Sequence, residues 1–362
     1  MGSKRAHPWG RPIHTSGDPV HNKKASAILL LLCLSLAACA SLDSRERLLR
    51  QLSEHPARSA ATWLGWRDKG LRDTIGPAPE LLVEYLRLDN TINGYDQLPQ
   101  SAPAGQGFAD EVLAAVEAMP PAVKAHLREY VLGIFLVTDL GASAYTEVLR
   151  DGAPHALGFI VLDVQALNRT ANGWATWREG TPFRPVPGVA CRLLIEPAAH
   201  DLRRNAIAYV LLHELGHLVG VATGAHANWW NPGNPAGYPF SSISWLGGKG
   251  GITSRWDEGF PEREGLRFYA DAEAQLPGDQ RLGIYTKLAR TDFVSLYAAT
   301  GSYEDFAETY AMYVHVVLLG RPWQLTVLGA GKPGLTMAAP ILQPRCAAKR
   351  RFMADLFAQG AP

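Results

Sequence analysis

Two patterns of apolar residues along the chain predict both helices and strands. Apolar residues recur at helical spacing in six segments, at positions 79–90, 108–119, 122–130, 293–299, 303–319 and 345–359. Three short apolar runs among glycines and prolines are instead typical of strands, at positions 131–137, 158–164 and 189–195. Asn172-Gly173 and the proline-rich segment 181–187 lie between the last two runs and have the composition of turns. The pattern therefore predicts an α+β structure, mostly helical with a small sheet.

A further apolar segment of helical character, residues 208–220, contains the sequence His-Glu-Leu-Gly-His. Residues four apart share a face of a helix, so His213 and His217 can direct two imidazoles at one ion. Glu214 lies next to them, where its carboxylate can reach a water molecule on that ion. A peptide-hydrolysing zinc site requires two such nitrogen ligands, a base and an open position for water. The alternative is an amphipathic helix with incidental histidines, but buried polar groups need partners.

Catalytic zinc needs a third protein ligand, and the chain offers two kinds of candidate. One is His226, in an extended H-E-x-x-H-x-x-G-x-x-H motif: Gly220 fits the glycine, but His226 lies three residues beyond the required position. The other is an acidic residue of segment 303–311, where Glu304 and Glu308 share a helical face. One carboxylate could bind the metal while the other accepts a hydrogen bond from a ligating imidazole. A solvated acidic helix start would explain Glu304 but not Glu308, which sits among apolar residues.

The sequence H-E-L-G-H together with the downstream E-D-F-A-E resembles the gluzincin metallopeptidases. It is most similar to the branch that contains the anthrax lethal factor catalytic domain and related zinc-binding peptidases. This resemblance, which covers motifs within residues 190–315, implies that Glu304 is the third zinc ligand and that Glu308 orients a ligating histidine. It also implies that Tyr297, seven residues before the ligand glutamate, helps to stabilise the oxyanion. Packing on a short helix is the alternative explanation for Tyr297.

The start of the chain carries an export signal. An apolar run at 27–38 follows Lys23-Lys24 and ends at Cys39, as in secretory signals, and it is shorter than the about 20 apolar residues of a transmembrane helix. The sequence Leu-Ala-Ala-Cys at 36–39 resembles the lipobox of bacterial lipoproteins, which implies cleavage before Cys39 and lipid attachment to its sulfur. An ordinary signal peptide is the alternative. We therefore expect a lipid-anchored protein of the bacterial cell envelope; the residue after Cys39 is not Asp, which resembles the outer-membrane default.

These features suggest a leader at 1–38, a membrane-proximal spacer at 39–78 and a zincin-like metallopeptidase domain at 79–362. In zincins, several strands precede the H-E-x-x-H helix and form a small sheet that packs on it. The 86 positions from 218 to 303 exceed what a minimal gluzincin needs, so we expect an insert at about 223–290. After cleavage of the leader and acylation of Cys39, Cys191 and Cys346 would remain. A disulfide between them and two free thiols are both open.

Charge and motif together define the expected function. The net charge of +1 over 362 residues gives no sign of a nucleic-acid partner. We expect an endopeptidase with one zinc ion and a peptide or protein substrate, in which Glu214 is the base. An edge strand, 189–195 or 158–164, would pair with the extended substrate. The alternatives are a non-catalytic binding lipoprotein with a structural metal and a zinc hydrolase that acts on cell-wall peptide. Glu214 argues against the first, because a structural site has no use for a base.

Overall fold

The computed structural model describes residues 44–103, 106–151, 156–247, 253–329 and 332–359; the expected leader and Cys39 lie outside these residues. Helices make up 52% and strands 17% of the structure, which confirms the expected α+β class. After a helix at 44–54, the described α-helices are α2 (Ala60–Arg67), α3 (Glu80–Asn93), α4 (Gln106–Glu117), α5 (Pro121–Tyr130), α6 (Ala171–Gly180), α7 (Arg203–Ala222), α8 (Arg281–Leu288), α9 (Ser302–Met312) and α10 (Ala347–Ala358). The strands are β1 (Ile75–Pro77), β2 (Gln100–Ser101), β3 (Val131–Thr138), β4 (Ala144–Val148), β5 (Gly158–Asp163), β6 (Ala190–Leu194), β7 (Trp245–Leu246), β8 (Thr253–Ser254), β9 (Gln324–Gly329) and β10 (Lys332–Ala338).

The main sheet has the strand order β1-β3-β5-β4, and β2 pairs with β3. Strands β1, β3 and β5 are parallel, whereas β4 runs antiparallel to β5 and forms one edge of the sheet. Two of the expected strands, 131–137 and 158–164, are therefore present as β3 and β5. The expectation that 158–164 could be a substrate-binding edge is wrong, because β5 lies between β3 and β4.

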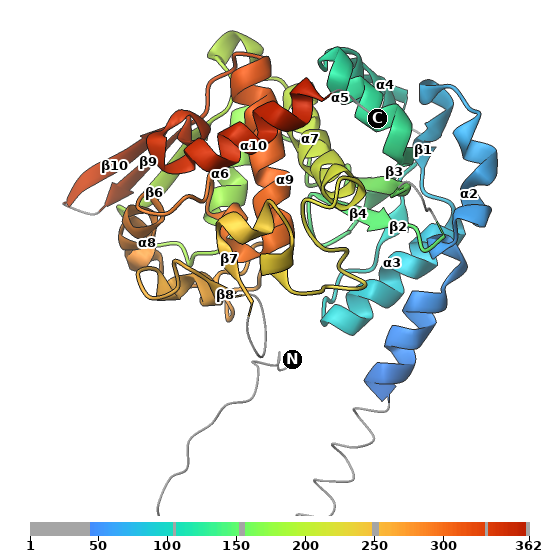
Figure 1. Cartoon of the computed structure of the whole chain (residues 1–362), viewed down its shortest axis with the longest axis horizontal. Helices are drawn as coiled ribbons and strands as arrows, with labels where there is room; N and C mark the ends of the chain where they lie inside the picture. Colours follow the sequence, from blue (N-terminus) through green and yellow to red (C-terminus); the bar gives the residue numbers. More distant parts are fainter. Residues whose placement is uncertain (1–43, 104–105, 152–155, 248–252, 330–331, 360–362) are drawn as a thin grey trace, which may run out of the picture.

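Both faces of the main sheet are buried, which explains why β3 and β5 are almost continuously apolar. On one face, Ile134 and Ile160 belong to the core that contains residues of α4, α5 and α7. On the other face, Phe135 and Phe159 pack against Trp63 of α2, with ring centroids 5.1 and 5.4 Å away. The sheet thus lies between two layers of helices (Figure 1), and its contact with α7 agrees with the expected packing of a small sheet on the H-E-x-x-H helix.

Helices α7 and α9 lie side by side in the centre of the molecule (Figure 1). Their close approach depends on Gly216, because a Cβ atom there would lie only 2.9 Å from the Cα of Ala307. Helix α7 is long and apolar enough to cross a membrane by length and composition, but 78% of its apolar window is buried inside the protein. Its apolar surface therefore forms the core against which the sheet and α9 pack.

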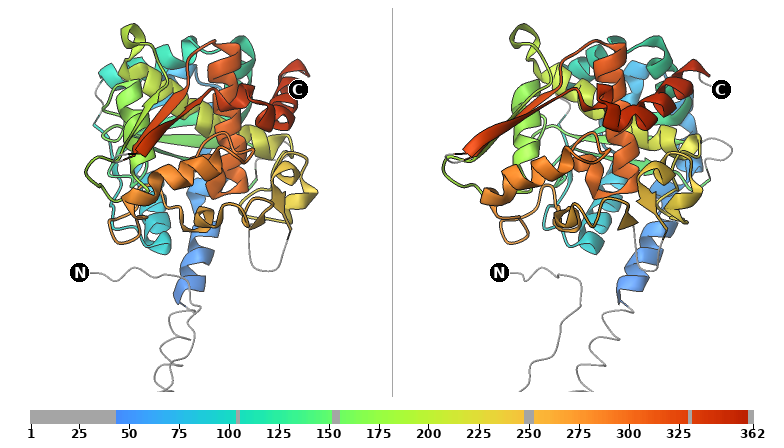
Figure 2. Two further views of the ribbon diagram at one scale, coloured as in Figure 1. Left: turned by 90° about the vertical axis from the view of Figure 1, so that its left-hand side faces the viewer. Right: turned by 60° about the vertical axis from the view of Figure 1, so that its left-hand side comes forward.

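A second sheet has the order β10-β9-β6, and its strands are antiparallel. The third expected strand, 189–195, is found here as β6. The β9–β10 hairpin extends to one side of the body, as the right-hand view of Figure 2 shows. Side chains of α6 bond to the backbone of β6 and the residue that follows it: the Oγ1 of Thr176 accepts from the backbone N of Leu193 at 3.0 Å, and Asn172 accepts from the backbone N of Ile195 at 2.7 Å. Hydrogen bonds from side chains of α6 therefore hold β6 against this helix.

The connection between α7 and α9 covers positions 223–290, where we expect an insert. It consists of short 3-10 turns, the β7–β8 pair and the single α-helix α8 among its described residues.

Near the other end of the chain, Trp63 is buried and its indole donates to the carbonyl of Ala57 at 2.8 Å. Cys191 and Cys346 are both free thiols.

Candidate metal centre

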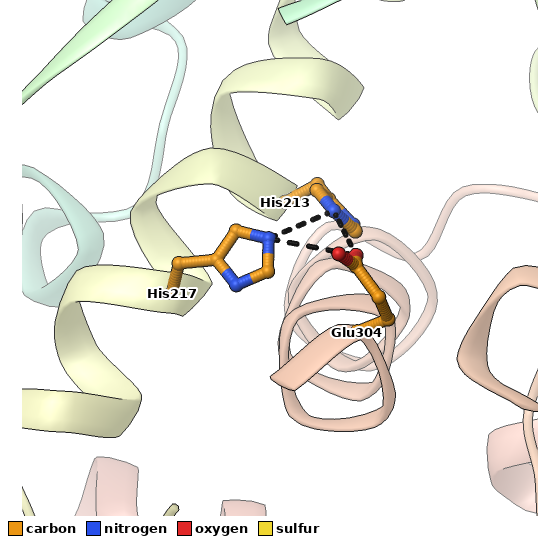
Figure 3. Close-up of side chains that lie close together, drawn as sticks. All are labelled: His213, His217 and Glu304. Carbon is orange, nitrogen blue, oxygen red and sulfur yellow. Dashed lines mark hydrogen bonds and ion pairs between the residues drawn. The ribbon is translucent and has the colours of Figure 1, made fainter. Parts of the chain in front are cut away.

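Three side chains from two helices converge on one point (Figure 3). His213 and His217 project from α7, one turn apart, and Glu304 projects from the first turn of α9. The Oε2 atom of Glu304 lies 3.1 Å from the Nε2 of His213 and 3.5 Å from the Nε2 of His217. The two Nε2 atoms are 3.2 Å apart. The described residues thus bring the three predicted ligands into a group that can hold a metal ion.

The dimensions of this triangle suit zinc. Ligands at about 2.0–2.1 Å from a tetrahedral zinc ion are separated from one another by about 3.3 Å. The Oε2 of Glu304 is buried and receives no hydrogen bond from any other described residue. When the two Nε2 atoms carry no proton, three lone-pair acceptors face one another and repel, and a cation between them would satisfy all three. The donor set of two imidazoles and a carboxylate, to which the described residues add no fourth ligand, matches the set used by catalytic zinc sites.

Glu308 contacts His213 on the side of the imidazole that faces away from the other two candidate ligands. Its Oε1 lies 2.9 Å from the Nδ1 of His213, so the imidazole directs its other nitrogen, Nε2, towards the metal position. Arg178 of α6 binds both oxygens of Glu308, at 2.9 and 3.1 Å, and the hydroxyl of Ser295 donates to Oε2 at 2.6 Å. Burial opposes the charge on Glu308, but Arg178 and His213 outweigh it and lower the pKa of this carboxyl to about 2.

The local field of the site is strongly negative. Burial opposes protonation of His213, yet the carboxylates of Glu304 and Glu308 raise the pKa of its imidazole to about 10. Glu304 is partly buried, which opposes its charge, but His217 and His213 hold the pKa of its carboxyl well below the ordinary value. A field that favours a proton on an imidazole also favours a divalent cation, which competes with that proton for the same nitrogen.

Glu214 lies next to the ligand group and is held by the edge strand. The hydroxyl of Thr146 on β4 donates to the Oε2 of Glu214 at 2.6 Å. Glu214 is 7% exposed and lines the same cleft as His213, His217 and Glu304. Thr146 fixes one carboxylate oxygen, and no hydrogen bond found among the described residues engages the other, which can bind a water molecule.

Tyr297 also lies at the site. Its ring is 5.4 Å from that of His213 and 4.7 Å from that of Phe268, and it lines the cleft. Burial, followed by the charge of Glu304, raises the pKa of this phenol well above its ordinary value, so the hydroxyl keeps its proton as a donor. The structure thus places Tyr297 beside the ligand group, and its role in stabilising an oxyanion stays a prediction.

His226, the other candidate ligand, is directed elsewhere. It lies behind α7, where its Nδ1 is 2.8 Å from the carbonyl oxygen of Ala227 and its ring is 5.4 Å from that of Phe306. A Cβ atom on Gly220 would lie 2.1 Å from the Nε2 of His226, so the glycine makes room for this ring. Burial lowers the pKa of the imidazole to about 4. The structure favours Glu304 over His226 as third ligand.

The ligand group opens into a cleft of about 590 Å³. Strand β4 and the C-terminal half of α3 form part of its wall, and residues of the 223–290 connection, including Trp229 and Phe268, form another. Trp229 lies edge-on to His217, with ring centroids 6.1 Å apart. Strand β6 does not contribute to the cleft lining found among the described residues, so the expectation that 189–195 binds substrate is not supported; β4 is a strand that does line the cleft.

Two residues of the site, Thr146 and Arg178, were missed by sequence reasoning. Thr146 lies in the segment Ala-Tyr-Thr-Glu-Val, whose mixed pattern could have indicated an edge strand. Arg178 is 130 residues away from Glu308, and no motif connects the two.

Comparison of the chain with family models, with curated proteins and with solved structures gives no significant match. The interpretation of the site therefore depends on its own geometry. That geometry, a largely buried group of His213, His217 and Glu304, is consistent with a zinc site of the H-E-x-x-H type.

Proposed function

We propose that the protein is a zinc-dependent metallopeptidase, an endopeptidase that hydrolyses peptide or protein substrates. The observation that carries the proposal is the position of Glu214 in a cleft beside a three-ligand group. A structural zinc site fills its fourth position with protein and needs no neighbouring base. An open fourth side and a fixed carboxylate are the two features that hydrolysis adds.

The free edge of β4 supports a peptide substrate. The carbonyl oxygen of Ser143 accepts from the N–H of Asp163, and the N–H of Leu149 donates to the carbonyl oxygen of Leu157. The backbone groups of Ser143 and Leu149 therefore point towards β5. Because bonding alternates along an antiparallel strand, Ala144 and Thr146 direct their backbone N–H and C=O groups away from β5. Both residues line the cleft. An extended peptide can therefore add to this edge as a further strand.

In the proposed reaction, bound zinc would lower the pKa of a water molecule to about 7 and polarise the scissile carbonyl. His213, His217 and Glu304 would hold the ion, and Glu308 keeps His213 in the correct tautomer. Glu214 accepts the proton of the attacking water and delivers it to the leaving amine. The hydroxyl of Tyr297 donates to the oxyanion.

Export and membrane anchoring form the second part of the proposal. They are supported by the sequence alone, namely the apolar run at 27–38 and the lipobox-like sequence that ends at Cys39. We propose that Cys39 carries a lipid that holds the protein in the bacterial envelope, on the periplasmic side of the outer membrane. Mass spectrometry of Cys39 in the protein purified from membranes tests this part independently of catalysis.

Metal content tests the ligand set. We expect about one zinc per chain in the wild type by plasma emission spectrometry and strongly reduced zinc in Glu304→Ala, because two histidines alone do not hold catalytic zinc. Zinc that is retained in Glu304→Ala would contradict the ligand assignment. Absence of zinc in the wild type after reconstitution would favour a non-catalytic binding protein.

The role of Glu214 is tested separately. Glu214→Gln keeps the shape of the side chain and its bond to Thr146 but removes the base, so the variant should retain zinc and lose peptide hydrolysis. Cleavage at the wild-type rate would show that Glu214 is not the base.

A further inference from the structure

One wall of the cleft carries an acidic side chain with no cationic partner. Asp89 lies near the end of α3 and lines the same cleft as the metal ligands. None of the ion pairs formed by the described residues includes Asp89. The Nδ2 of Asn93 donates to the main-chain carbonyl oxygen of Asp89 at 3.0 Å, and the nearby charge is the carboxylate of Glu147. Burial and this like charge raise the pKa of Asp89 to about 6. An ionised carboxylate there is short of positive charge.

The neighbouring carboxylate, in contrast, is fully satisfied. Glu147 accepts hydrogen bonds from the hydroxyls of Tyr85 and Tyr145 and, at 2.7 Å, from the indole of Trp230. The Nε of Arg58 lies 3.7 Å away, and its guanidinium stacks on Trp230 at 3.5 Å. These donors are already engaged with Glu147, so none of them compensates the charge of Asp89.

Arg267, the only lysine or arginine among the described residues that line the cleft, is also bound elsewhere. The guanidinium of Arg267 donates to the main-chain oxygens of Glu264 and Leu266 at 2.9 and 2.7 Å. It lines the cleft together with Asp89, yet no ion pair joins the two. The cleft thus presents Asp89 to whatever ligand enters.

The alternation of side chains along β4 connects Asp89 with a bound peptide. Thr146 faces α7 and Glu214, so Tyr145 and Glu147 face the opposite side, where they meet Tyr85 of α3. Asp89 follows Tyr85 by one helical turn and shares its face of α3. In a peptide that extends this sheet, every second side chain would point to the side of Asp89.

We propose that Asp89 is a specificity-determining residue that selects substrates with a cationic side chain, lysine or arginine, at one fixed position relative to the scissile bond. This inference rests on the proposed peptidase function and names its substrate class. The aromatic rings of Tyr95 and Tyr145 line the cleft with Asp89 and would pack against the alkyl part or the cation of such a side chain.

The test uses the full-length, zinc-loaded protein and a degenerate peptide library, followed by matched peptides that carry lysine or methionine at the preferred position. The wild type should cleave the lysine peptide with a kcat/KM on the order of tenfold higher, as expected for a half-buried charge pair. Asp89→Asn should cleave both peptides alike, at about the rate of the wild type on the methionine peptide. Asp89→Lys should prefer a glutamate peptide. Asp110→Asn, the same change on α4 outside the cleft, should keep the wild-type preference.

The possible outcomes separate this inference from the proposed function. Cleavage without a preference for lysine or arginine, or a preference that persists in Asp89→Asn, overturns the inference and leaves the peptidase proposal intact. Absence of cleavage of every peptide by zinc-loaded wild type overturns the peptidase proposal and the inference with it. Unchanged cleavage of the methionine peptide shows that Asp89→Asn is folded.

Discussion

Replacement of Gly216 by alanine separates helix packing from helix propensity. A Cβ atom at Gly216 would lie 2.9 Å from the Cα and 3.2 Å from the carbonyl oxygen of Ala307, and 3.3 Å from the Cβ of Tyr310. Non-bonded carbon atoms prefer a separation of about 3.5–4.0 Å. The nearest atoms belong to backbone, so α7 and α9 must move apart by about 0.6 Å or more.

The energetic balance of this substitution has two opposing contributions. Alanine favours the helix by about 1 kcal/mol relative to glycine, whereas overpacking costs about 1–3 kcal/mol. We expect a net loss of unfolding free energy of about 0–2 kcal/mol. The effect on zinc should be larger, because Glu304 lies one turn before Ala307 and metal–ligand distances tolerate only about 0.2 Å. We expect zinc affinity to fall about ten- to a hundredfold, as when a ligand loses its support.

Two measurements on Gly216→Ala check this reasoning: chemical denaturation of the metal-free protein and a competition titration with a zinc chelator of known affinity. The control is Gly65→Ala in α2, where a Cβ atom would meet nothing within 4 Å. That variant should gain up to about 1 kcal/mol and bind zinc as the wild type does. Unchanged zinc affinity in Gly216→Ala would refute the idea that the contact at Gly216 positions Glu304.

Three further predictions follow from buried charges. Arg178→Met leaves the Glu308 carboxylate without its cation, so the free energy of unfolding measured by denaturation should fall by about 3–5 kcal/mol. Competition with a chelator should show weaker zinc binding, and unchanged binding would contradict the role of Arg178. Lys349→Met should cost about as much, because the fully buried Lys349 lies 2.6 Å from Asp305, and adding Asp305→Asn should restore most of the loss. The pKa of Asp89 is raised to about 6 from 3.8, so the folded protein binds a proton on this carboxyl more tightly than the unfolded protein does. The contribution of Asp89 to the free energy of unfolding therefore falls as the pH rises from about 4 to about 6. Asp89→Asn should therefore melt at a higher temperature than wild type above about pH 6 and equally below about pH 4; the opposite trend would be evidence for a hidden cationic partner.

The three candidate ligands and Glu308 could be predicted from the sequence because each pair is local. His213 and His217 on α7, and Glu304 and Glu308 on α9, have the spacing of one helical turn. Strands β3 and β5 were also predictable, because both of their faces are buried and their sequences are continuously apolar. Polar residues one helical turn apart and strands buried on both faces each produce a pattern that can be recognised in a single sequence.

The remaining parts of the site depend on contacts between distant segments. Asn172-Gly173 has the composition of a turn, yet it begins α6: Thr170 caps the helix through the N–H of Gly173 at 3.2 Å, and Asp201 accepts from the N–H of Asn172 at 2.7 Å. The same helix brings Arg178 to Glu308. Strand β4 carries polar residues on both faces because each face meets a polar partner, Glu214 on α7 and Tyr85 on α3. These partners are defined only once the chain has folded.

The position of α9 shows how the parts combine. Three acidic residues within little more than one turn of this helix contact three different elements: Glu304 faces the histidines of α7, Asp305 binds Lys349 of α10, and Glu308 binds Arg178 of α6. A rotation of α9 that moved Glu304 away from His213 would have to break two buried ion pairs, each costing about 3–5 kcal/mol. The ion pairs therefore fix the rotation of the helix, and the contact of Gly216 with Ala307 fixes its distance from α7. The metal-binding triangle is held in place by packing and charge before any metal binds.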